Sequence, residues 1–282
     1  MFYIRVPLLT NLWDQPVKTK TAYMKSFFAL FALVFTTVTF SQQRQCTMIT
    51  YKMYMTIPFA SSYSGGYDRL IANESAGIFY HLGGENYSDA QSAKNYTAPI
   101  PGDALPTKET MYTRADAEKK ELLLFSHLAR STALVKDTYG GFNWNVGSET
   151  KVIAGYTCYK AEAYYRGRTW TAWFTPQIPV PFGPWKLLGL PGLILQAYDA
   201  TGEVSFDAVQ VSTAGCDLLQ RDFRSLVKTK NKVPMPYREC IEKNKEFFDN
   251  LDKQMDADSK AIVVPDFKVP RFGYELKYEW EE

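Results

Sequence analysis

Charged side chains near the middle of the chain are the first candidates for chemistry. Glu162, Asp199 and Glu203 could supply paired carboxylates for general acid and base work, but their spacing is not diagnostic of a catalytic pair. Arg166 and Arg168 flank a glycine and, two residues apart, share one strand face, where they could clasp a carboxylate or a phosphate. We expect these arginines to hold nearby acidic side chains.

Other catalytic patterns are missing from the sequence. The chain has two histidines, His81 and His127, and neither lies in a zinc-ligand pattern such as His-Glu-X-X-His. There is no Gly-X-Ser-X-Gly elbow, no Walker loop and no dinucleotide fingerprint. We therefore predict no catalytic residue, no metal site and no cofactor.

The N-terminal part of the chain carries the pattern of a secretory leader. Met24-Lys25-Ser26 is followed by the segment from Phe27 to Phe40, which is apolar apart from three threonines and is too short for an ordinary membrane span. We predict a signal peptide over residues 24–41, with residues 1–23 as a non-native or unprocessed extension. The mature part, residues 42–282, is then a single domain, exported to the periplasm or the extracellular space, with no membrane span.

The charge of the mature part excludes one class of partner. Removing residues 1–41 takes out four basic residues and one acidic residue, which leaves 28 basic and 29 acidic residues. Nucleic-acid binding requires a concentrated excess of Lys and Arg. We therefore expect no nucleic-acid partner.

The cysteines suggest disulfides if the protein is exported. Cys46, Cys158, Cys216 and Cys240 allow two bridges with three connectivities, and none forms a Cys-X-X-Cys pair. We favour Cys216 with Cys240, because they bracket a loop that returns to a predicted helix. The alternative is one bridge with buried free thiols.

An aromatic and proline-rich run ends in a six-residue motif. The run contains Trp173-Phe174-Thr175-Pro176 and Gly183-Pro184-Trp185, and the motif is Gly189-Leu190-Pro191-Gly192-Leu193-Ile194. In this order the elements resemble those of the GLPGLI family, secreted proteins of Gram-negative bacterial envelopes. The resemblance covers residues 144–211 well. It implies an exported envelope protein and brings no established chemistry.

The glycines and prolines of this region predict its local structure. Arg166-Gly167-Arg168 fits a tight turn between two strands, because glycine accepts positive φ at little cost. Three prolines between residues 177 and 184 exclude an interior strand, so we predict a rigid surface loop there. Gly189 and Gly192 allow a bend, after which the apolar run 193–195 suits a buried strand.

Alternating apolar residues predict most of the remaining elements. Residues 49–56 alternate with the period of two of a half-buried strand. Further strands are predicted over residues 122–125, 132–135, 151–165, 169–175, 193–198 and 204–211. Residues 83–107 read as a long loop, residues 236–255 as a helix that packs on the sheet, and the end of the chain as an edge strand. The predicted fold is mainly β: a large curved antiparallel sheet or half-open barrel with one packed C-terminal helix.

Three functions remain open from the sequence. The favoured one is non-catalytic binding of an envelope protein or an apolar ligand, through a surface made of Trp170, Trp173, Phe182 and Trp185 beside Arg166 and Arg168. The alternatives are a hydrolase whose site is assembled from scattered residues, and a structural scaffold. Exposed rings beside a cavity would favour binding, whereas buried rings would favour the scaffold.

Overall fold

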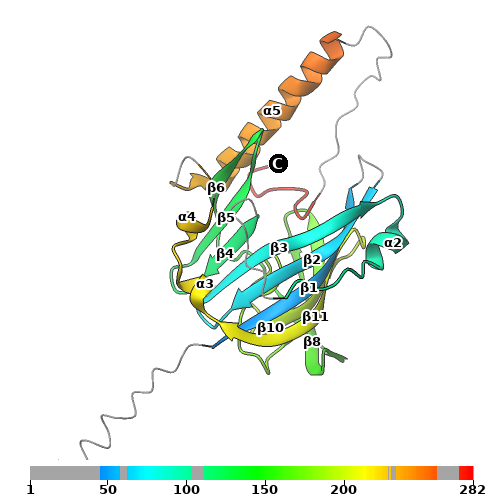
Figure 1. The fold of residues 1–282 in the computed structure, drawn as a ribbon, viewed down its shortest axis with the longest axis vertical. Helices are drawn as coiled ribbons and strands as arrows, with labels where there is room; N and C mark the ends of the chain where they lie inside the picture. Colours follow the sequence, from blue (N-terminus) through cyan, green and yellow to red (C-terminus); the bar gives the residue numbers. More distant parts are fainter. Residues whose placement is uncertain are drawn as a thin grey trace, which may run out of the picture. The chain divides into compact units, whose positions relative to one another are not determined.

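The computed structural model describes residues between Gln45 and Glu281 (Figure 1). The described residues are 45–57, 62–102, 111–227, 229, 233–258 and 273–281. The predicted leader and the extension before it lie outside this set. No helix within the described residues is long and apolar enough to cross a membrane.

A single open sheet of twelve strands dominates the fold. Its spatial order is β12-β6-β5-β4-β3-β2-β1-β11-β10-β9-β8-β7, and every neighbouring pair is antiparallel except β12 with β6. The strands are β1 (Gln45–Ile57), β2 (Ser62–Ala72), β3 (Ala76–Tyr87), β4 (Tyr112–Asp116), β5 (Glu121–Leu128), β6 (Ser131–Asp137), β7 (Asn145–Ile153), β8 (Tyr156–Tyr165), β9 (Arg168–Thr175), β10 (Leu193–Asp199), β11 (Val204–Gly215) and β12 (Met235–Pro236). The prediction of a mainly β fold with a large antiparallel sheet is confirmed.

The C-terminal helix is also confirmed. Helix α5 (Tyr237–Asp258) begins directly after Pro236. The proline ring would clash with the backbone of a preceding helical turn, so the helix does not extend further toward the N-terminus. Cys240 is buried on its first turns, and Asn244 caps the β5–β6 turn by accepting from the N–H of Ala129 at 2.6 Å. The first turns of α5 therefore anchor the helix to this hairpin.

The sheet curls enough to bring its distant parts together. Strands β6 and β7 lie near opposite ends of the strand order, yet only residues 138–144 connect them. A link of this length spans at most about 28 Å, so the end of β6 and the start of β7 must lie within that distance of each other. The curl encloses an inner face, on which Tyr51, Leu70, Phe79 and Phe206 form part of the larger apolar core.

The opposite, outer face of β2–β6 has its own cover. Ile71, Ile78 and Tyr80 lie on it and pack in a second apolar cluster with Leu219 and Phe223. These last two belong to α3 (Asp217–Gln220) and α4 (Phe223–Leu226), which Figure 1 shows beside the sheet. Both faces of this half of the sheet are therefore buried.

The disulfide prediction was wrong in its pairing. Cys46 is bonded to Cys216, with a Cα–Cα distance of 5.3 Å, whereas Cys158 and Cys240 are buried free thiols. Cys46, the second residue of β1, pairs in register with Ala214 on β11, so the strand ladder brings together two cysteines 170 residues apart. Closeness in sequence was the wrong criterion, because the partner of Cys216 is set by strand pairing.

Two further predictions need correction, one for a loop and one for the tail, and the predicted turn is confirmed. The predicted loop over residues 83–107 contains the end of β3 and helix α2 (Ala90–Lys94), whose first turn is capped by the Asp89 carboxylate accepting from the N–H of Ser92 at 2.8 Å. Residues 273–281 form turns and no strand, so no edge strand exists in the described part of the tail. The predicted turn at Arg166-Gly167 is present, with φ values of 47° and 86°.

Candidate functional site

The predicted surface loop of the signature region is buried inside the curled sheet. Val180, Phe182, Leu187, Leu188 and Leu190 all belong to the larger apolar core. A short bridge joins Phe182 to Leu188, and the N–H of Gly189 donates to the Pro181 carbonyl at 3.0 Å. The prolines do keep the segment out of the sheet. Its apolar side chains nevertheless draw it inward, because burying them is more favourable than exposing them.

The four candidate aromatic residues are core residues. The exposed fractions are 0% for Trp170, 2% for Phe182, 7% for Trp173 and 8% for Trp185. The structure brings Trp170 and Trp185 together, with ring centroids 5.8 Å apart. Trp173 is three residues along β9 from Trp170 and so points to the opposite face, where the Lys151 ammonium lies 4.1 Å from its ring centroid. None of these rings forms an exposed binding surface.

The core leaves little empty space beside these rings. A cavity bordered by Leu70, Phe79, Phe182 and Trp185 has a volume of about 10 Å³. That is room for about one water molecule. An apolar ligand of ordinary size does not fit there.

Arg168 holds carboxylates at one end of this region. Its Nη1 lies 2.6 Å from Asp199 and 2.9 Å from Glu203, and its Nε donates to the carbonyl of Gly273 at 2.9 Å. Asp199 in turn accepts from the N–H of Val204 at 2.8 Å. Two of the three carboxylates singled out in the sequence, Asp199 and Glu203, thus serve as partners of an arginine, and the third, Glu162, lies 3.1 Å from the Lys160 ammonium.

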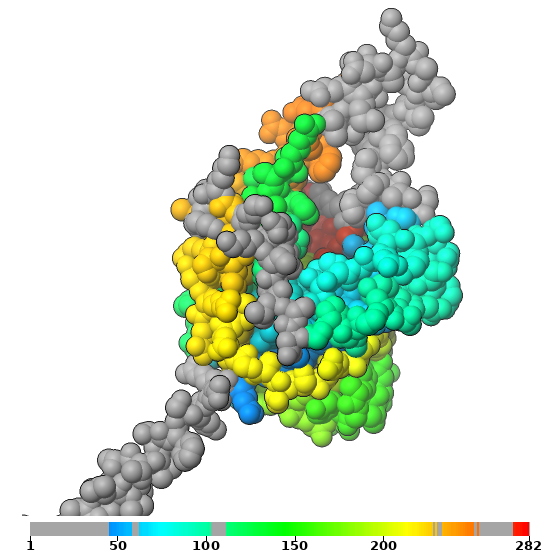
Figure 2. All heavy atoms as spheres, viewed as in Figure 1, coloured from blue at the N-terminus to red at the C-terminus, as the bar shows by residue number. Residues whose placement is uncertain are grey.

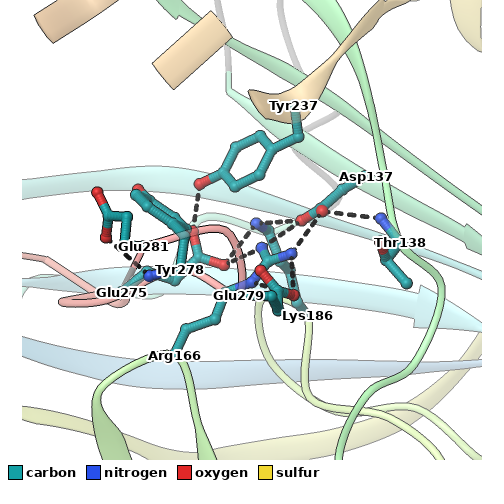
Figure 3. A network of polar contacts seen from close by, with 9 residues as sticks. All are labelled: Asp137, Thr138, Arg166, Lys186, Tyr237, Glu275, Tyr278, Glu279 and Glu281. Carbon is teal, nitrogen blue, oxygen red and sulfur yellow. Dashed lines mark hydrogen bonds and ion pairs between the residues drawn. The ribbon is translucent and has the colours of Figure 1, made fainter. Parts of the chain in front are cut away.

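Arg166 belongs to a larger buried cluster, which we call the tail clasp: Arg166, Asp137, Lys186 and Tyr237 (Figure 3). They come from the β8–β9 turn, the end of β6, the signature segment and the start of α5. Arg166 donates to both oxygens of Asp137 at 2.8 Å, and Lys186 donates to Asp137 at 2.7 Å. The side chains of Arg166 and Lys186 are each 1% exposed.

The tail clasp holds the described C-terminal segment, residues 273–281, which we call the tail. Glu275 accepts from Arg166 at 2.6 Å and from Lys186 at 3.0 Å, and its other oxygen accepts from the Tyr237 hydroxyl. Glu279 accepts from Arg166 Nη2 at 2.8 Å. Figure 3 shows these side chains converging from different segments on the tail.

Electrostatics fix the charge states in the tail clasp. Burial by itself raises the pKa of Asp137, but the positive charges of Lys186 and Arg166 outweigh burial and hold that pKa below its ordinary value. Burial also disfavours the charged form of Arg166, yet the surrounding carboxylates raise its pKa further. Burial, together with the negative charge of Glu275, raises the pKa of the Tyr237 hydroxyl, which therefore stays protonated and donates.

This arrangement is suited to holding polypeptide and not to acid–base chemistry. The two buried cations face two buried carboxylates and the half-exposed Glu279, so each charge already has its counter-charge. The backbone contributes as well, because the N–H groups of Leu276 and Lys277 both donate to the Arg166 carbonyl, at 2.8 and 3.1 Å. Within the described residues no group of His, Cys, Asp or Glu is arranged to hold a metal ion.

Sequence reasoning missed most of the tail clasp. Asp137, Tyr237 and Glu275 lie in separate segments without any common spacing. Lys186 offered the one usable signal, since it is a lone charge between Trp185 and the apolar Leu187 and Leu188. A charge inside an apolar run needs a buried partner.

A second polar pair, Asp68 with His81, was also missed. His81 Nδ1 lies 2.7 Å from Asp68 Oδ1, and the side-chain exposures are 43% and 3%. The other oxygen of Asp68, Oδ2, is buried with no hydrogen-bond partner. The hydrogen bond to the Asp68 carboxylate raises the pKa of His81, and burial raises the pKa of Asp68.

Comparison with known proteins supports the sequence resemblance. A family model described as a protein of unknown function (Porph_ging) matches residues 166–196, a short part of the chain. It corresponds to the GLPGLI family, so the resemblance is confirmed over that segment. Comparison with curated protein sequences gives no match.

Two solved structures of PNGF-II are similar to this chain. The one in space group P21 has a TM-score of 0.49 and covers 72% of this chain and 34% of its own. The one in space group C2 has a TM-score of 0.47 and covers 72% of this chain and 33% of its own. Sequence identity is 18% in both cases, and this chain spans about a third of the length of those chains.

Proposed function

We propose that this chain is an exported protein of the bacterial envelope that binds another protein and does so without catalysis. One observation carries the proposal: the buried charges of the tail clasp are used to hold a polypeptide segment. The leader pattern over residues 24–41 and the family resemblance support the envelope location.

An apolar ligand is less well supported than a protein. The inner face of the sheet, where such a ligand would lie, is occupied by the signature segment, and the cavity beside Trp185 is about 10 Å³. Ligand pockets in proteins are typically about 300 to 1,000 Å³. A protein partner needs no such cavity.

Hydrolysis has one observation in its favour, the pair of Asp68 and His81. A carboxylate that orients a half-exposed imidazole is half of a general-base arrangement. Among the described residues, however, no serine, threonine or cysteine side chain hydrogen-bonds to His81. Binding of a protein therefore remains the better-supported function.

Photo-crosslinking in living cells tests the proposal. A photoreactive amino acid replaces Arg238, an exposed residue of α5 next to Tyr237 of the tail clasp, or Glu74, an exposed residue of the β2–β3 turn, as the control. We expect the first position to give a discrete adduct with an envelope protein after cell fractionation, and the control to give none. The absence of an adduct at Arg238, or the same adducts at both positions, would contradict the proposal.

A further inference from the structure

The tail contacts the rest of the protein in the way a bound peptide contacts a receptor. Its main chain donates from Leu276 and Lys277 to the Arg166 carbonyl, and its Gly273 carbonyl accepts from Arg168. In Figure 2 the tail (dark red) is visible between the β5–β6 hairpin (green) and β2–β3 (cyan). Main-chain hydrogen bonds with separate side-chain anchors are the usual features of peptide recognition.

The first anchor is aromatic. The ring of Tyr274 lies 5.0 Å from that of Trp185 and 5.6 Å from that of Phe206. Both partners are core residues, so the site offers a preformed aromatic wall. An aromatic side chain buries a large area there while losing few rotatable bonds.

The second anchor is a carboxylate. Without Glu275 and Glu279, the buried cations Arg166 and Lys186 have Asp137 as their one acidic partner among the described residues. One buried positive charge would then be uncompensated, and this is costly in a desolvated site. The site therefore selects a segment that supplies a carboxylate directly after the aromatic anchor.

A second aromatic group follows the carboxylate anchor along the tail. The rings of Tyr278 and Trp280 stack at 4.8 Å, and both contact Tyr237, at 5.7 and 6.4 Å. The Arg166 guanidinium lies 5.7 Å from the Tyr278 ring and 5.9 Å from the Trp280 ring. These contacts extend the recognised chemistry to an acidic and aromatic stretch spanning residues 274–280.

We propose that the tail clasp, with the aromatic wall of Trp185 and Phe206, is a recognition site for acidic–aromatic segments, and that the tail is its resident occupant. A segment of the partner protein with the same chemistry displaces the tail. This inference rests on the proposed function for the existence of a partner, and it adds the site and the chemical class. The charge complementarity between two buried cations and Glu275 with Glu279 carries it.

Cutting the full chain between α5 and the tail tests the site directly. A protease recognition sequence is placed within residues 259–272, and the folded protein is cleaved so that only non-covalent contacts retain the tail. A fluorescent synthetic peptide of residues 272–282 is then added, and its anisotropy is followed with the cut and the uncut protein. We expect the labelled peptide to exchange into the cut protein and to bind the uncut protein much more weakly.

Variant peptides define the recognised chemistry. A Glu275→Gln peptide should bind at least about tenfold more weakly, because it cannot neutralise the buried cations. A Lys277→Gln peptide, changed at an exposed residue, should bind as well as the natural sequence. The Lys186→Met protein should lose the preference for Glu275 over Gln.

Several outcomes would overturn the inference. Loss of the near-ultraviolet circular dichroism signal on cleavage would make the tail an integral part of the fold. Failure of the labelled peptide to exchange, or equal affinity of the Glu275→Gln peptide, would contradict displacement or the acidic requirement. If the uncut protein formed a concentration-dependent dimer that the peptide dissociates, the displacing segment would come from a second copy of this chain and not from a partner protein. If the peptide exchanged but no partner were crosslinked in cells, the recognition site would stand and the proposed binding of an envelope protein would fail.

Discussion

Arg166 and Asp137 form a two-point contact, in which Nη1 and Nη2 of the guanidinium each lie 2.8 Å from a different carboxylate oxygen. The pair joins the β8–β9 turn to the end of β6, 29 residues away, and both side chains are almost fully buried. Its geometry is the bidentate one that arginine favours with carboxylates. Removing one partner leaves a buried charge without compensation.

Arg166→Met should therefore destabilise the protein by about 3 to 5 kcal/mol, as measured by urea denaturation. The control is Arg238→Met, which breaks a helix-surface pair with Glu242 in which both side chains are more than half exposed. Exposed pairs of this kind contribute about 0 to 1 kcal/mol. Equal effects of the two substitutions would show that burial of the Arg166 pair is not the source of its effect.

Trp185→Ala should unfold the protein or cost about 3 to 5 kcal/mol, because it leaves a large cavity in the core. Trp185 is 8% exposed and contacts Trp170 and Tyr274. Tyr164→Ala, at a side chain 65% exposed, should change the melting temperature little. Equal melting temperatures of the Trp185→Ala and Tyr164→Ala proteins would show that Trp185 lies on the surface and not in the core.

Gly192→Val should lower the melting temperature more than Gly189→Val does. Both glycines have positive φ, 151° and 95°, so each substitution strains the backbone by about 1 to 3 kcal/mol. A Cβ at Gly192 would also lie 2.1 Å from the Thr175 carbonyl oxygen, whereas nothing lies within 4 Å of one at Gly189. Thermal denaturation of both variants decides the matter, and equal melting temperatures would exclude the clash as a cause.

The cysteines should give one bridge and two thiols. Peptide mapping without reductant should recover Cys46 linked to Cys216, and thiol titration of the unfolded, unreduced protein should detect Cys158 and Cys240. Replacing Cys46 and Cys216 by alanine should lower the free energy of unfolding by about 2 to 5 kcal/mol. A peptide joining Cys216 to Cys240 would refute this pairing.

Stability should fall as the pH rises through the titration of His81. The folded-state pKa of His81 is raised, so its contribution is complete below the unfolded pKa of about 6.5 and is lost as the pH rises through the folded value. The raised pKa of Asp68 has the same sign, because this buried carboxylate also favours the protonated state. Urea denaturation across this range should show the loss in the natural protein and in His127→Gln but not in Asp68→Asn, which lacks the carboxylate. An unchanged pH dependence in Asp68→Asn would rule the pair out.

Local patterns in the sequence were sufficient for local structure. The alternation from Ile49 to Thr56 gave a strand, Arg166-Gly167 gave a turn, and the periodic apolar residues after Pro236 gave a helix. Period and turn chemistry depend on neighbours along the chain, so they can be read without knowing the rest of the fold.

The candidate site depended on contacts that no local pattern specifies. Arg166 pairs with Asp137, Glu275 and Glu279 and not with Glu162, which is nearer in sequence, because the curl of the sheet decides which segments meet. For the same reason, the proline-rich loop was misplaced on the surface. Its prolines exclude a strand, but they do not determine whether the loop faces solvent or the interior.

The pairing of β1 with β11 also sets the order in which this chain can fold. The neighbours β2 to β6 follow one another along the chain, as do β7 to β10, so each series can assemble from contacts close in sequence. The ladder between β1 and β11 joins the two series and must wait until residues as distant as Cys46 and Ala214 are both available. Pairing over such a separation closes a long loop and slows folding. Until β11 arrives, β1 has an unpaired edge in the half-folded chain, and that edge is where premature association with another molecule would start.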